Sequence, residues 1–176
     1  MALNINFVLN GKEVSAAISE EMSLLTVLKE ILHVNSVKRA CVRGECGACT
    51  IIIDGKAMNS CLVLAATAEG SNIVTLESLG SPDNLHPLQQ AFYDTGAFQC
   101  GFCTPGFIMS AKALLDKNPN PSREEIKAGL SGNLCRCTGY MKPLEAVSKA
   151  AEKINTSEVA VQAVVNAAVR MNGGRV

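Results

Sequence analysis

The chain contains eight cysteines, and they fall into two groups of four. In the first group, four residues separate the first two thiols, two separate the next two, and the fourth follows at a distance; its members are Cys41, Cys46, Cys49 and Cys61. This is the plant-type ligand spacing of a [2Fe–2S] cluster, which accepts and passes on single electrons. Gly44 and Gly47 lie between these thiols. Because glycine adopts positive φ angles and allows close backbone approach, both favour a loop that wraps a cluster.

The second group joins a C-x-x-C segment to a later C-x-C segment; its members are Cys100, Cys103, Cys135 and Cys137. Such a set could hold zinc, although paired zinc ligands are usually about two to four residues apart, which counts against the C-x-C half. Disulfides are a further alternative, but no secretory signal directs the chain to an oxidising compartment. Reduced, metal-bound thiolates therefore account best for all eight cysteines, and we expect a cytoplasmic location.

The amino-acid composition argues against two other classes of function, nucleic-acid binding and membrane spanning. Lysine plus arginine and aspartate plus glutamate number sixteen each, and 48% of the residues are hydrophobic, as in a soluble globular protein. Without an excess of basic residues, the chain is not expected to bind nucleic acid. No apolar run approaches the roughly 20 residues that a membrane-spanning helix needs, so we expect no span.

The first half of the chain has the pattern of a small sheet with one crossing helix. Residues 3–9 alternate apolar and polar side chains, and Asn10-Gly11 predicts a type I′ hairpin turn. Ser23 can cap a helix over residues 24–33. Asp54-Gly55 predicts a second hairpin, and residues 73–76 a last strand. This order suits a β-grasp sheet that holds the cluster loop.

The second half changes to a helical period after the turn-rich residues 80–84. Pro87, Thr104-Pro105 and the capping box from Ser122 to Glu125 begin three helices, and residues 143–154 form a fourth. Cys103 would precede a helix N-terminus, whose partial positive charge favours a thiolate. We therefore predict an α+β chain with a plant-type ferredoxin-like domain at 1–79, a four-helix bundle domain at 85–154 and a C-terminal helical extension at 155–176.

Three motifs together resemble one family: the iron–sulfur subunit of molybdenum hydroxylases, which include xanthine dehydrogenase and aldehyde oxidoreductase. The motifs are residues 41–49, 98–106 and 132–140, and the resemblance extends to about residue 154. It implies a [2Fe–2S] cluster in each lobe, with molybdopterin and FAD on partner subunits. It also implies that Gln99 and Cys137 lie against the pterin, although Gln99 could be an ordinary polar side chain. Members commonly end soon after the fourth helix, so the extension is a departure; it could pack on the bundle as a fifth helix or dock a partner or second copy.

The resulting hypothesis is a non-catalytic electron-transfer subunit of a molybdenum-containing oxidoreductase, which passes electrons from molybdopterin through both clusters to FAD or an external acceptor. The partner's substrate would be a purine, another N-heterocycle or an aldehyde. No phosphate-binding loop or Ser/His/Asp order indicates catalytic residues in this chain. The alternatives are a free-standing two-cluster ferredoxin, which the neutral charge disfavours, and a zinc-stabilised interaction module. His33 and His86 lie outside the cysteine motifs, so a Rieske centre is not expected. Whether Arg43 and Arg136 tune the clusters is left open.

Overall fold

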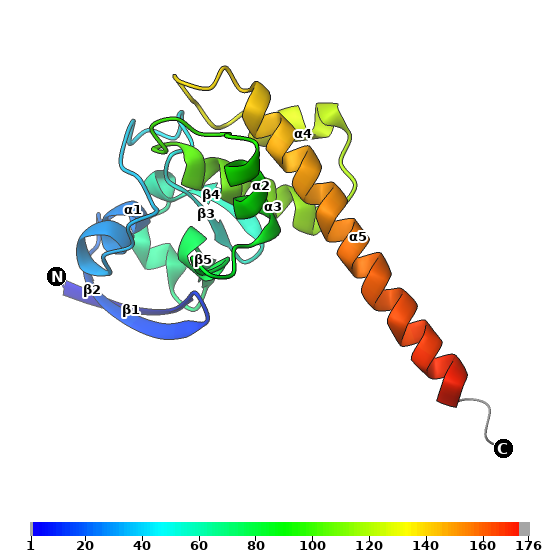
Figure 1. Ribbon diagram of the computed structural model, residues 1–176. Helices are drawn as coiled ribbons and strands as arrows, with labels where there is room; N and C mark the ends of the chain where they lie inside the picture. The colour runs from blue at the N-terminus through cyan, green and yellow to red at the C-terminus, as the bar shows by residue number, and fades with distance from the viewer. Residues whose placement is uncertain (1, 173–176) are drawn as a thin grey trace.

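The computed structural model describes the backbone of residues 2–172 and the side chains of residues 3–156. It confirms the α+β class: a five-stranded mixed sheet in the first half is followed by helices (Figure 1). The first-half elements are β1 (Ala2–Leu9), β2 (Lys12–Ser19), α1 (Leu24–Thr26), β3 (Thr50–Ile53), β4 (Lys56–Asn59) and β5 (Asn72–Val74). The second-half helices are α2 (Pro87–Asp94), α3 (Thr104–Lys117), α4 (Arg123–Leu130) and α5 (Met141–Asn172).

The sheet has the strand order β2-β1-β5-β3-β4. β1 pairs antiparallel with β2 and parallel with β5, and β3 pairs antiparallel with both β4 and β5. Both predicted hairpin turns are confirmed, because Asn10 and Gly11 have φ angles of 52° and 78°, and Asp54 and Gly55 have 48° and 77°. Two consecutive positive φ angles are what a type I′ turn requires.

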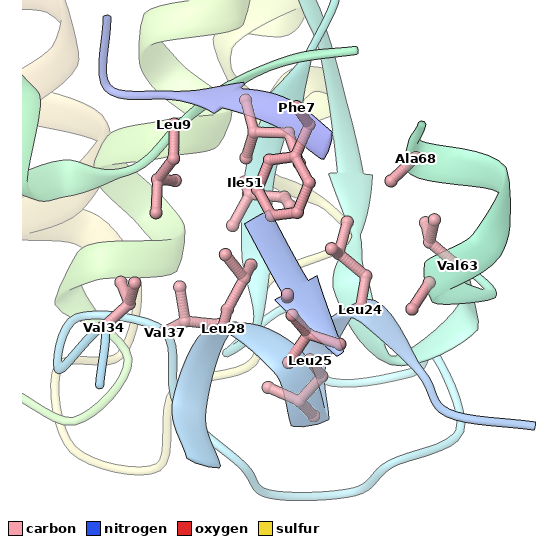
Figure 2. Packing of buried hydrophobic residues seen from close by; sticks show 14 of the residues in the cluster. Phe7, Leu9, Leu24, Leu25, Leu28, Val34, Val37, Ile51, Val63 and Ala68 are labelled. Carbon is pink, nitrogen blue, oxygen red and sulfur yellow. The ribbon is translucent and has the colours of Figure 1, made fainter. Parts of the chain in front are cut away.

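The helix predicted over residues 24–33 differs from the observed one. Ser23 caps α1 as expected and accepts a hydrogen bond from Thr26 N, but the chain then widens into a π-helical turn over Val27–Ile31. Leu24, Leu25, Val27 and Leu28 are each at most 1% exposed, so the segment is buried around more than a single stripe. Figure 2 shows these leucines beneath Phe7 of β1 and Ile51 of β3. Tertiary packing therefore overrides the regular helical period here.

Helices α2 to α5 surround a second hydrophobic core, whose largest buried members are Leu88, Phe92, Phe107 and Ile126. The capping box from Ser122 to Glu125 is confirmed at the start of α4. A third, smaller apolar cluster lies between the two cores where α3 covers β3, because Met109 and Ala113 pack against Ile52 of the sheet. The lobes therefore share an apolar contact.

The C-terminal helix corrects a prediction. In place of a helix ending at residue 154 and a separate one in the extension, α5 runs unbroken from Met141 to Asn172. No glycine or proline follows Pro143 within it, and a proline in the first turn costs no helical hydrogen bond. Asn155 Nδ2 donates to Pro119 O at 2.8 Å and ties the helix to the loop before α4. Beyond this tie, α5 projects away from the rest of the molecule (Figure 1). Among the helices within residues 2–172, none combines the length and apolarity needed to cross a membrane.

Candidate metal centres

The first four thiols are brought together by the loop before β3 and the turn after β4. Cys41 and Cys46 lie in that loop, and Cys49 immediately precedes β3 and is 3% exposed. Cys61 lies in a 3₁₀ turn after β4. Ser60 fixes this turn, because its backbone N and its Oγ both donate to Cys49 O, at 3.2 and 2.9 Å. The hairpin β3–β4 therefore returns the distant fourth cysteine to the loop.

The glycines of this loop have the role that the sequence predicts. Gly44 and Gly47 have φ angles of 81° and 66°. A Cβ atom on Gly44 would collide with the side chain of Leu62, and one on Gly47 would collide with the Gly132 carbonyl. Asn59 Nδ2 donates to Gly44 O at 2.9 Å and holds the loop from the side of β4. The loop can close around its thiols only because these positions lack a side chain.

Within the first group, the thiols meet in two pairs. Hydrogen bonds from Arg43 N and from the Cys46 thiol lower the pKa of Cys41 to about 6. Burial, followed by the bond that its thiol makes to Cys49, raises the pKa of Cys61 to about 11. The charge of Cys41 also acts on Cys61, so the pairs Cys41–Cys46 and Cys49–Cys61 are neighbours. The fold thus brings two pairs of thiols into the same part of the loop.

The second group repeats this arrangement between the α2–α3 and α4–α5 loops. The Cys137 thiol donates to Cys100 Sγ at 3.8 Å, and this bond raises the pKa of Cys137. Burial, together with the bond from its thiol to Cys135, raises the pKa of Cys103 to about 12. Burial therefore outweighs the effect on the pKa that we expected from the N-terminus of α3. The pairs are Cys100–Cys137 and Cys103–Cys135.

The turn after Cys135 supports that thiol directly. Burial acts to raise the pKa of Cys135, but hydrogen bonds from Thr138 Oγ1 at 3.2 Å, Thr138 N and Cys137 N outweigh it and lower the pKa to about 7. Cys135 N donates to the Tyr140 hydroxyl at 3.0 Å. Tyr140 has a φ of 69°, rare for a side chain of its size. The turn therefore directs three hydrogen-bond donors at the Cys135 sulfur.

Two pairs in each group suit a [2Fe–2S] cluster, in which four thiolates are shared between two irons. Within the described part of the chain, no three His, Cys, Asp or Glu side chains gather as a single-ion site would require.

The Thr104 hydroxyl is a further indication of a cluster in the second group, because it is buried and has no hydrogen-bond partner among the described residues. Thr104 follows Cys103 directly, and buried polar atoms are nearly always hydrogen-bonded. A cluster sulfur beside Cys103 would provide the missing acceptor.

The structure also shows where the other residues named in the sequence analysis lie. Gln99 Nε2 donates to Cys137 O at 3.0 Å, so the structure brings these two exposed residues together. His86 caps α2, accepting from Leu88 N, and His33 lies in an exposed turn. Arg43 forms an exposed ion pair with Glu45 at 2.8 Å. The sequence placed Thr104 at the start of a helix but gave no sign that its hydroxyl is buried without a partner. It also did not predict the exposed apolar side chains near Cys100 and Cys137, because burial and exposure have no local signature in the sequence.

Comparisons with known proteins agree with two cluster domains. A "2Fe-2S iron-sulfur cluster binding domain" matches residues 10–91, and a "[2Fe-2S] binding domain" matches residues 75–148. The chain is 49% identical over 151 residues to the nicotinate dehydrogenase small FeS subunit of Eubacterium barkeri, covering 86% of this chain and 96% of that one. It is 47% identical over 152 residues to the nicotine 6-hydroxylase small subunit of Paenarthrobacter nicotinovorans, covering 86% and 92%.

A solved structure shows the same likeness in three dimensions. The crystal structure of quinoline 2-oxidoreductase from Pseudomonas putida 86 contains a chain that superimposes with a TM-score of 0.82 at 42% identity. The match covers 86% of this chain and 94% of that one. At this identity, the similarity extends beyond the fold to the family.

Proposed function

Because the chain belongs to the iron–sulfur subunits of the molybdenum hydroxylase family, we propose that it passes electrons from a molybdopterin-containing partner through two [2Fe–2S] clusters to FAD or an external acceptor. The chain is the electron-transfer part of an oxidoreductase, and the chemistry on the substrate takes place on another subunit. The observation that carries the proposal is the arrangement of eight thiols in two groups, each made of two pairs.

The proposed ligands follow from this pairing. Cys41, Cys46, Cys49 and Cys61 hold the cluster of the first lobe, and Cys100, Cys103, Cys135 and Cys137 hold that of the second. When bound, each cluster supplies one-electron chemistry. The protein holds the thiols in position, encloses Cys49, and offers hydrogen bonds from Arg43 N and the Thr138 hydroxyl to the sulfur atoms. Such bonds are among the features that set a cluster's potential.

The second thiol group is proposed to face the molybdopterin partner. Cys100 and Cys137 are exposed, whereas Cys49 of the first group is buried. Large apolar side chains lie exposed in the same segments: Phe98, Phe102, Leu134, Tyr140 and Met141. We call these five residues the apolar rim. An apolar rim around exposed thiols suits a docked partner chain better than a free-standing ferredoxin. Gln99 and Cys137, already joined by a hydrogen bond, would then lie against the pterin.

Several finer parts of the sequence interpretation stay predictions. They include the boundaries 1–79, 85–154 and 155–176, the description of the second lobe as a four-helix bundle, an FAD-binding partner and a cytoplasmic location. For the substrate we propose an N-heterocycle that contains a pyridine ring, because the relatives compared above are named for nicotinate, nicotine and quinoline. An aldehyde or a purine is the competing expectation, because relatives named aldehyde oxidoreductase and xanthine dehydrogenase match at 46% and 51% identity.

The native protein, isolated with its partner chains, tests this proposal. We expect four irons and four acid-labile sulfides per chain, two distinct [2Fe–2S] signals in electron paramagnetic resonance, and a molybdopterin-containing partner. The complex should oxidise nicotinate, nicotine or quinoline faster than aldehydes or purines. Zinc in place of iron would contradict the electron-transfer role. An iron-loaded chain with no partner would contradict the subunit role and favour a free-standing ferredoxin, and preference for an aldehyde or a purine would contradict only the substrate.

A further inference from the structure

Asn133 lies in the contact between the two lobes and is only 3% exposed. Its Nδ2 donates a hydrogen bond of 3.1 Å to the backbone carbonyl of Gly47, in the cluster loop of the first lobe. The next residue repeats the connection, because Leu134 N donates to Cys46 O at 3.0 Å. Two consecutive residues before Cys135 therefore bind two consecutive residues of the loop that carries Cys46 and Cys49.

The two loops are also as close as their backbones allow. A Cβ on Gly47 would collide with the Gly132 carbonyl and lie 2.5 Å from Asn133 Nδ2. A Cβ on Gly106, in the first turn of α3, would collide with the Gly47 carbonyl. The loop of the first group is thus enclosed by the α4–α5 loop and by the helix that follows Cys103. The two loops carry thiols, and α3 begins directly after Cys103.

The bond from Asn133 is not needed to satisfy its acceptor. Gly47 O already accepts from Thr50 N at 3.1 Å and from Thr50 Oγ1 at 2.7 Å, both within the first lobe. Among these donors, Asn133 alone comes from the second lobe. Its contribution is therefore to the relative placement of the lobes.

Beside the bond from Leu134 N to Cys46 O, the lobes meet through apolar contact, which has less directional character. Met109 and Ala113 of α3 pack on Ile52 of β3 through apolar atoms. Apolar contact stabilises an interface without fixing its register, whereas a hydrogen bond is restricted in both distance and angle. Loss of the Asn133 side-chain bond would leave the lobes joined by the Leu134–Cys46 bond and the apolar contact, with one fewer directional restraint on their relative placement.

We infer that Asn133 is a positioning residue that sets the separation and orientation of the two thiol groups, and hence the passage of electrons between their clusters. The inference rests on the proposed function, since it assumes a cluster in each group. Asn133 lies two residues before Cys135 in the motif 132–140 and is not proposed as a ligand. Its role is exerted through Gly47, the residue after Cys46.

The test compares variants of the iron-loaded full-length chain in its native complex. Asn133→Ala removes the bond between the lobes. Asn59→Ala is the matched control, because Asn59 Nδ2 donates to Gly44 O of the same loop at 2.9 Å from within the first lobe. The measurement is the magnetic interaction between the two reduced clusters in electron paramagnetic resonance, which falls steeply with their separation, together with the rate of electron transfer between them.

We expect Asn133→Ala to keep both cluster signals but to weaken the magnetic interaction and to slow electron transfer, while Asn59→Ala keeps the interaction. A second variant, Gly106→Ala, forces Gly47 away without removing a hydrogen-bonding group, and should also weaken the interaction. Unchanged interaction in both interlobe variants, equal loss in Asn59→Ala, or a wild-type protein whose two clusters do not interact would overturn the inference. A wild-type chain without two [2Fe–2S] signals would instead contradict the proposed function.

Discussion

The backbone carbonyl of Cys46 accepts a hydrogen bond of 3.0 Å from the backbone amide of Leu134, the residue directly before Cys135. One hydrogen bond and one peptide unit therefore connect a cysteine of the first group with a cysteine of the second. The two lobes have separate hydrophobic cores, yet their thiol-bearing loops are in direct contact.

Cys46→Ser should remove one cluster and leave the other. Each group has its own thiols on its own loops, so losing a ligand of the first group leaves the pairs Cys100–Cys137 and Cys103–Cys135 complete. We expect loss of the first-lobe signal in electron paramagnetic resonance and a fall to two irons per chain. Simultaneous loss of both signals in a folded protein would show that the two sites are not independent.

Thr104→Val should lower the reduction potential of the second-lobe cluster. The buried Thr104 hydroxyl has no partner among the described residues, and a hydrogen bond from it to a cluster sulfur would stabilise the more negative, reduced state. A bond stronger by about 1 kcal/mol in the reduced state corresponds to about 40 mV for a one-electron couple. A redox titration checks this.

Thr104→Ser is the matched control, because it keeps the hydroxyl and should keep most of the potential. The first-lobe cluster provides an internal reference in the same titration, since Thr104 lies beside the other group. Equal potentials for Thr104→Val and the wild-type protein would show that the hydroxyl does not act on the cluster.

Glu77→Gln should reduce the acid sensitivity of the chain. Desolvation acts to raise the pKa of Glu77, but hydrogen bonds from Ser36 Oγ and N and from the Thr75 hydroxyl outweigh it and lower the pKa below the ordinary 4.5. A carboxylate with a lowered folded-state pKa contributes stability above its unfolded-state pKa, and this contribution is lost as the pH falls. Because the side chain is exposed, we expect at most about 1 kcal/mol.

Denaturant unfolding followed by circular dichroism at pH 7 and near pH 4 measures this effect. The wild-type chain should lose more stability than Glu77→Gln over that range. Glu13→Gln, which changes an exposed carboxylate on β2, should behave as the wild type does. Identical pH dependence in the wild type and Glu77→Gln would contradict the prediction.

Met141→Glu should weaken binding of the molybdopterin-containing partner. Met141 belongs to the apolar rim near Cys137 and is 61% exposed, so a charge there would be buried without a partner on docking. We expect the dissociation constant to rise by about tenfold or more, corresponding to about 1.4 kcal/mol. Met58→Glu, on β4 of the first lobe, is the matched control. Equal weakening by both variants would argue against the apolar rim as the docking surface.

Truncation after Asn155 should leave both clusters in place, because all eight cysteines precede it. A projecting helix of this kind is marginal in water unless it packs against something, so we expect the truncated chain to bind its partner less tightly. Iron content and the dissociation constant of the complex measure the two effects. Assembly with unchanged affinity would show that the extension is dispensable for docking.

The sequence by itself determined the features that depend on neighbouring residues. Turns at Asn10-Gly11 and Asp54-Gly55, caps at Ser23 and Ser122 and the division of the cysteines into two groups all follow from short-range spacing and backbone preference. The tertiary structure decided what depends on packing and distance along the chain: the π-helical turn under the sheet, the burial that raises the pKa of Cys103, and the bond between Asn133 and Gly47. No local pattern specifies a contact between residues so far apart, because it forms only when two separately folded loops are brought together.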